Sequence, residues 1–200
     1  MATVYNKNYP APPFDRREIV RYIGMPEELA ELEKTVSDCI EKASDKLAYK
    51  VCYAEFPIEV YENEVDLGFA KTQSKGLIKE LSGCHSIILF AATVGIEIDR
   101  MIAKSALASP LLELVLSAIG TERVEALCDE FCRELKVQKA EMGIGVRRRF
   151  SPGYSDLPLD LQKDVFRALG CSKHIGLSLN ESLLMSPSKS VTAIVGLHDL

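Results

Sequence analysis

The sequence predicts an α+β fold, a single domain in which helices flank a mixed or antiparallel sheet. Three observations support this prediction. Apolar residues recur at intervals of three and four over long stretches, which is the helical period. Ser86–Ala92 is an almost continuous apolar run of strand length, typical of a central strand covered on both faces. Helices and strands mix without a regular β-α-β alternation, which favours α+β over a parallel α/β sheet.

The first half of the chain begins with an extended N-terminal arm over residues 1–17, where Pro10, Pro12 and Pro13 restrict the backbone. A short amphipathic helix over 17–23 should end at Gly24, and Pro26 should open a longer helix over 27–48. Between 50 and 67 the pattern predicts strands interrupted at Pro57. A short helix over 73–81 follows, with Gly83 as its C-cap.

The second half is expected to be richer in helix. We expect a helix over 95–108 capped by Thr93, and a long helical segment over 110–141 with a break or kink near Gly120. A further helix over 159–169 should end at Gly170, and short strands should cover 175–179 and 191–197. The chain contains no internal repeat, low-complexity tract or linker, so residues 1–200 are predicted to form one domain.

Composition narrows the class of protein. With 47% hydrophobic and 26% charged residues the chain is typical of a soluble globular protein. Its net charge of −5 argues against binding nucleic acid or an anionic membrane, because clustered positive charge supplies most of that affinity. No signal peptide is evident, and no stretch reaches the roughly 18 apolar residues of a membrane span. We therefore expect a cytoplasmic protein.

The sequence offers little for catalysis. Six cysteines without a secretory signal indicate reduced thiols. Cys128 and Cys132 lie one helical turn apart but lack a complementary pair of ligands, so they fit small core residues better than a metal site. No Gly-x-Ser-x-Gly elbow and no glycine-rich phosphate loop occurs. The residues point to binding and positioning, and we predict no metal ligands and no catalytic nucleophile.

The stretch from Arg147 to Pro158 combines three arginines, a Pro-Gly turn and an aromatic residue. Arg149 offers a planar set of donors for a carboxylate or phosphate, and Tyr154 offers a flat apolar face. The same residues also fit a plain turn with a solvated edge. Two interpretations are also open for Glu125, which lies beside the buried stripe of its helix. Its carboxylate faces either a cleft at the edge of the core or solvent.

Several linked motifs give the chain a family resemblance. Arg149–Tyr154, Lys173–Ser182, Met185–Pro187 and the Ser190-Val191 pair follow one another at set spacings. Over residues 120–196 this order resembles the activation domain of cobalamin-dependent methionine synthase, and the first hundred residues are more similar to its free-standing relatives. The resemblance implies a protein that binds S-adenosylmethionine (AdoMet) and places its methyl group over the cobalt of a cobalamin carried by a partner protein. A flavodoxin-like donor supplies the electron.

The resemblance also assigns roles to particular residues. It implies that Arg149 holds the AdoMet carboxylate and that Glu125 meets the amino group. Ser151, Gly153 and Tyr154 are expected to contact the ligand through the loop backbone, and Tyr154 is the one residue with a possible positioning role in catalysis. The chain departs from the family pattern in two ways. It ends at Leu200, before the family's further aromatic contact, and it has no recognisable match to the acidic ligand residue near the start of the family domain.

Three functions remain compatible with the sequence. The protein reactivates a methionine synthase in trans, it serves a different corrinoid methyl-transfer protein, or it is a regulatory module that binds AdoMet without supporting chemistry. Cobalamin must arrive on the partner, since no Asp-x-His-x-x-Gly motif for a lower ligand is present.

Overall fold

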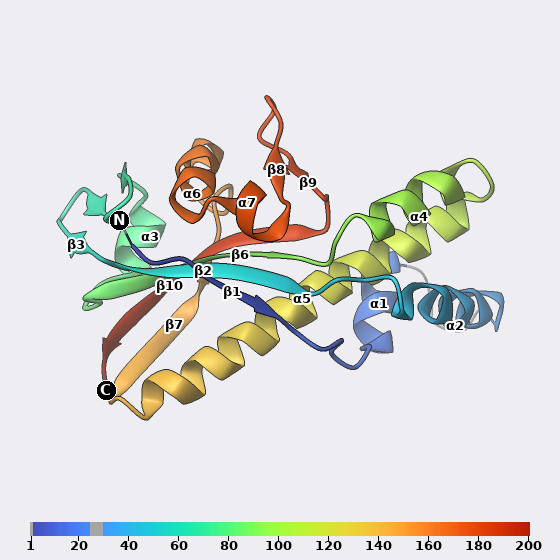
Figure 1. Ribbon diagram of the computed structural model, residues 1–200, viewed down its shortest axis with the longest axis horizontal. Helices are drawn as coiled ribbons and strands as arrows, with labels where there is room; N and C mark the ends of the chain where they lie inside the picture. The colour runs from blue at the N-terminus through green and yellow to red at the C-terminus, as the bar shows by residue number, and fades with distance from the viewer. Residues whose placement is uncertain (1, 25–29) are drawn as a thin grey trace.

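A five-stranded antiparallel sheet forms the centre of the protein in a computed structural model, which describes residues 2–24 and 30–200. The strand order is β1-β2-β6-β10-β7 (Figure 1). Its strands are β1 (Tyr5–Asn8), β2 (Lys50–Pro57), β6 (Ser86–Thr93), β7 (Ile144–Phe150) and β10 (Ser190–Asp199). The middle strand β6 is buried along its whole length, as its continuous apolar run predicts.

Helices cover one face of the sheet and enclose the first core. They are α1 (Arg16–Ile23), α2 (Ala30–Ser44), α4 (Glu97–Ala106) and the long α5 (Pro110–Ala140). The core on this face joins Phe90 of β6 and Val195 of β10 to Phe131 of α5. The helix α5 crosses the molecule beneath the sheet in Figure 1 and contacts both α1 and α4.

Shorter elements cover the opposite face and enclose a second core. They are α3 (Lys75–Glu80), η1 (Leu159–Leu161), α6 (Gln162–Leu169), α7 (Cys171–Ile175), and the small strands β3 (Glu59–Val60), β4 (Val65–Asp66), β5 (Lys71–Thr72), β8 (Ser178–Leu179) and β9 (Met185–Ser186). This core joins Leu89 and Ile194 of the sheet to Val165 of α6. The predicted α+β class with an antiparallel sheet is therefore confirmed.

Most predicted elements are present, with shifts at their ends. Gly24 and Gly170 end α1 and α6 in the left-handed conformation, with φ of 69° and 57°. The start predicted at Pro26 for the second helix lies outside the described residues. Gly83 is not the C-cap of α3, because that cap is Leu81. Thr93 is not the cap of α4, because it belongs to β6 and its Oγ1 accepts from the amide of Gly95.

Three expectations about extended structure were incomplete. The N-terminal arm contributes the edge strand β1, which pairs with β2, because an edge strand needs only one hydrogen-bonded neighbour. The strand β7 was not predicted, and Arg149 and Phe150, expected in a loop over residues 149–154, are its last two residues. At the other end of the chain, the strand predicted over 175–179 begins only at Ser178, because residues 171–175 form α7.

The helix α5 has no break at Gly120 and runs unbroken for 31 residues. A Cβ at position 120 would lie 2.8 Å from Cγ of Lys189 and 2.9 Å from Cγ1 of Ile98. Glycine is therefore required here for the close approach of neighbouring side chains to the helix, and the backbone keeps its helical path.

Candidate ligand-binding site

A bulge in β7 directs Arg149 toward α5. Val146 pairs with Leu197 and Arg149 pairs with Val195, which leaves two residues of β7 opposite the single residue Gly196. The extra residue reverses the usual alternation of side chains, so that Val146 and Arg149 both point to the face covered by α5. The sequence alone cannot reveal this change of phase.

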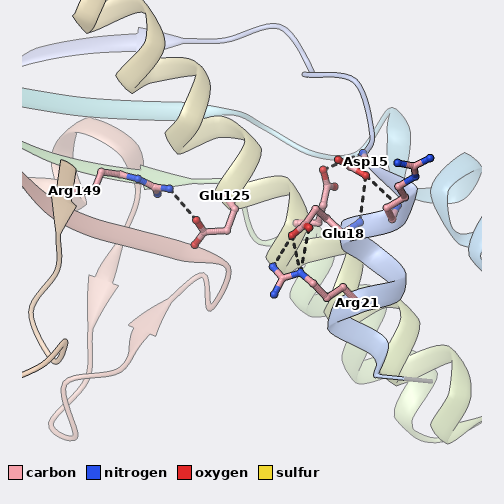
Figure 2. A network of polar contacts seen from close by, with 7 residues as sticks. Asp15, Glu18, Arg21, Glu125 and Arg149 are labelled. Carbon is pink, nitrogen blue, oxygen red and sulfur yellow. Dashed lines mark hydrogen bonds and ion pairs between the residues drawn. The ribbon is translucent and has the colours of Figure 1, made fainter. Parts of the chain in front are cut away.

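Arg149 contacts two carboxylates on α5. Its Nη2 donates to Oε2 of Glu125 at 3.1 Å and to Oδ1 of Asp129 at 2.7 Å. Figure 2 shows the Arg149 side chain extending from its strand to Glu125 on the helix. Glu125 and Asp129 are four residues apart, so they project from the same face of α5 on successive turns.

The guanidinium is partly shielded from water, with 25% of the Arg149 side chain exposed. Burial by itself lowers the pKa of Arg149, but interactions with Cys128, Glu125 and Asp129 outweigh burial and raise it overall. Burial also raises the pKa of the Cys128 thiol, which is therefore neutral, and the two carboxylates supply the negative charge. Arg149 remains cationic, as recognition of an anionic group requires.

The loop after β7 is closed by its own backbone. The amide of Tyr154 donates to the Ser151 carbonyl at 3.0 Å, and the amide of Gly153 donates to the Leu157 carbonyl at 2.9 Å. Gly153 has a φ of 85°, a conformation that residues with a side chain rarely adopt. The sequence-predicted turn at Pro152 and Gly153 is thus present, and it begins three residues after Arg149.

Asp156 attaches this loop to the N-terminus of α3. Its carboxylate accepts from the Ser74 hydroxyl at 2.6 Å and from the amides of Lys75 and Gly76 at 2.7 and 3.2 Å. A helix N-terminus favours an acceptor with negative charge. These hydrogen bonds, with the Ser74 hydroxyl first, hold the pKa of Asp156 below its usual value.

Tyr154 lies apart from the Arg149 pair. Its ring packs edge-on against Phe150, with centroids 5.5 Å apart and an interplanar angle of 81°, and the residue is 66% exposed. Within the described residues, no hydrogen bond or ion pair joins Tyr154 to Arg149 or Glu125. The structure therefore brings two of the predicted site residues together and places Ser151, Gly153 and Tyr154 in the adjoining loop.

A pocket of about 380 Å³ opens on the other side of Glu125, between α1 and α5. Glu18 and Arg21 of α1 line it together with Glu125. Figure 2 shows Glu18 and Arg21 paired with each other on α1, while the Glu125 side chain extends toward Arg149. Its remaining lining residues are Pro13, Asp15, Tyr22, Glu122, Ala126 and Asp129. Carboxylates from the N-terminal segment thus lie close to Glu125, although the sequence offered no recognisable acidic match in that region.

A buried ion pair holds the N-terminal segment in place. Arg123 of α5 is fully buried and pairs with Glu122. Its guanidinium also donates to the carbonyls of Pro12 and Pro13 at 2.5 and 2.8 Å and lies 3.9 Å from the centre of the Phe14 ring. The Asp15 amide donates to Glu122 at 3.2 Å, so this pair fixes the start of α1 beside the pocket.

The residues that the structure describes, 2–24 and 30–200, form no candidate metal centre. No group of three or more His, Cys, Asp or Glu side chains among them is placed to hold a metal ion. Cys128 is buried and Cys132 half-buried, both against the core on the α5 side. No helix in residues 2–24 and 30–200 is long and apolar enough to cross a bilayer.

Sequence reasoning did not identify three residues of this region, Asp129, Asp156 and Arg123. Asp129 had a usable signal, because it lies one helical turn after Glu125. Asp156 and Arg123 had none, because their partners lie 82 and 111 residues away in the chain.

Comparison with known proteins finds similarity at the level of the structure. No family model matches the sequence, and no curated protein matches it. A solved structure described as the MetH reactivation domain bound to AdoHcy superposes with a TM-score of 0.72 at 18% sequence identity. The match covers 98% of this chain and 79% of that one. The chain therefore has the fold of the methionine synthase reactivation domain.

Proposed function

We propose that the protein binds AdoMet beside Arg149 and reactivates a cobalamin-carrying methyltransferase, a methionine synthase in the first instance, by reductive methylation. The Arg149–Glu125 pair next to the 151–154 loop carries this proposal, since it sets a cation and an anion side by side at the surface. The similar MetH domain was solved with AdoHcy, which is AdoMet without its methyl group.

The pair suits the amino-acid end of such a ligand. A free α-amino acid carries a carboxylate and an ammonium on one carbon, so it needs opposite charges at close range. Arg149 would donate to the ligand carboxylate through N–H groups other than those of Nη2, which serves Glu125 and Asp129, and Glu125 would accept from the ammonium. Ser151, Gly153 and Tyr154 would bound the remainder of the ligand through their backbone groups.

In the proposed reaction the chemistry belongs to the two small molecules and the protein supplies geometry. One electron from an external donor, of the flavodoxin type, reduces Co(II) to Co(I). The cobalt electron pair then forms a bond to the AdoMet methyl carbon while the carbon–sulfur bond breaks. The electrons of that bond stay on sulfur, which leaves neutral AdoHcy and methylcobalamin. The step needs no protein nucleophile or base.

The experiment is an anaerobic assay with methyl-labelled AdoMet, a reductant of low potential and a cob(II)alamin-loaded methionine synthase. The proposal predicts label in methylcobalamin and an equal amount of AdoHcy. Arg149→Ala should abolish transfer, whereas Arg148→Ala should not, because that neighbour is 89% exposed and pairs with Glu80.

The outcome also separates the alternatives. Transfer only to a different corrinoid protein would identify another partner. AdoMet binding without transfer to any corrinoid protein would favour a regulatory module. An absence of binding by the wild-type protein would contradict the proposal.

A further inference from the structure

Asp129 holds the Arg149 guanidinium more closely than Glu125 does. Both carboxylates accept from the same nitrogen, Nη2, at 2.7 Å for Asp129 and 3.1 Å for Glu125. Asp129 is also the more exposed of the two, with 72% of its side chain accessible against 40% for Glu125. Asp129 is therefore an exposed surface carboxylate that already pairs with Arg149, the cation of the candidate site.

The charges at the site explain why the contact between Asp129 and Arg149 should affect ligand binding. One guanidinium and two carboxylates leave one negative charge in excess at the site. The amino-acid end of AdoMet has one ammonium and one carboxylate and therefore no net charge, and Glu125 can match the ammonium. The ligand carboxylate would then approach an arginine still held by Asp129, and like charges within a few ångströms repel.

We propose that Asp129 is an internal competitor that occupies Arg149 in the free protein and weakens binding of carboxylate-bearing ligands. This inference rests on the proposed function of the same site. Asp129 reaches Arg149 because it lies one turn beyond Glu125 on α5, and it also lines the adjoining pocket. When a ligand carboxylate binds Arg149, Asp129 either leaves the guanidinium or stays beside a second negative charge. Both outcomes cost binding free energy.

The sign of a mutational effect separates this role from a supporting one. If Asp129 only oriented Arg149, its loss would weaken binding. If it competes, Asp129→Asn should tighten binding of AdoMet about two- to fivefold, the range expected for loss of one exposed ion pair.

The matched control is Glu130→Gln. It removes the same charge from the next residue of α5, but Glu130 pairs with Arg133 and not with Arg149. Titration calorimetry should show tighter AdoMet binding for Asp129→Asn than for either Glu130→Gln or the wild type. Equal or weaker binding by Asp129→Asn would overturn the inference and leave the proposed function standing.

A second measurement needs no AdoMet. Phenylglyoxal modifies accessible arginines, and peptide mass mapping gives the rate at each position. Arg149 should react faster in Asp129→Asn than in the wild type, relative to the exposed Arg148 in the same sample. An unchanged rate at Arg149 would contradict the competitor role even if no variant bound AdoMet, an outcome that would separately reject the proposed function.

Discussion

The guanidinium of Arg149 on β7 lies 3.1 Å from the carboxylate of Glu125 on α5, although 24 residues separate them in the chain. The long helix α5 runs across one face of the sheet, and β7 then pairs antiparallel with β10 so that the two side chains meet. The bulge opposite Gly196 gives Arg149 the required direction. A change to either residue should therefore act on the same candidate site.

Glu125→Gln should weaken AdoMet binding by about tenfold, because a hydrogen bond to an ammonium loses the negative charge of its acceptor. Calorimetry with AdoMet and with an analogue lacking the α-amino group tests this. The wild type should prefer AdoMet, and the variant should lose that preference. Glu113→Gln, an exposed change in the first turn of α5, is the control. A variant that still distinguished the two ligands would show that Glu125 does not meet the amino group.

Tyr154→Phe should leave AdoMet affinity nearly unchanged, whereas Tyr154→Ala should lower it. The ring packs edge-on against Phe150, and phenylalanine keeps that contact, which is worth about 0.5–1.5 kcal/mol for an aromatic pair. Equilibrium dialysis of both variants measures the difference. Complete loss of binding in Tyr154→Phe would mean that the hydroxyl group contacts the ligand.

Asp156→Asn should loosen the 151–157 loop, because the carboxylate that holds the amides of Lys75 and Gly76 becomes a neutral amide. Hydrogen exchange at these amides should accelerate at neutral pH. In the folded protein the pKa of Asp156 lies below its ordinary value of 3.8, so this stabilisation is present above that pH.

The lowered pKa of Asp156 also predicts the pH range in which this stabilisation is lost. As the pH falls through the lowered pKa of Asp156, the wild-type carboxylate is protonated and the wild type should approach Asp156→Asn in stability. Asp160→Asn is the control, since that carboxylate pairs only with the nearby Lys163 among the described residues. A stability difference that persisted unchanged in acid would contradict the role of the Asp156 charge.

Arg123→Met should destabilise the protein by about 3–5 kcal/mol, because it leaves the buried Glu122 carboxylate without its partner. Denaturant unfolding measures this, with Arg133→Met as the exposed control. Adding Glu122→Leu should recover much of the loss, since the unpaired charge is then removed as well. A small effect of Arg123→Met alone would show that the N-terminal segment is held by other contacts.

The strongest local patterns predicted most of the fold. The apolar run at Ser86–Ala92 identified the central strand, and Gly24 and Gly170 marked two helix ends, because burial and left-handed caps leave a signal in adjacent residues. Gly120 misled the prediction, since its purpose is close packing against Lys189 and not a kink. β7 was missed because its three arginines are typical of a solvated loop.

Only part of the candidate site could be predicted from the sequence, because only part of it depends on neighbouring residues in the chain. The loop motif and the family resemblance led to Arg149 and Glu125, and the structure brings these two together. The attachment of Asp156 to α3 and of Arg123 to the N-terminal arm depends on tertiary contacts between distant parts of the chain. No local pattern encodes such contacts.

The most direct test of the account is a calorimetric titration of the purified protein with AdoMet, run with Arg149→Ala and Arg148→Ala. The account predicts that the wild type and Arg148→Ala bind alike. Arg149→Ala should lose about 2–5 kcal/mol of binding free energy, the cost of removing one partner from a charge-assisted contact. Undiminished binding by Arg149→Ala would contradict the site, and absence of binding by the wild type would restrict the similarity to the fold.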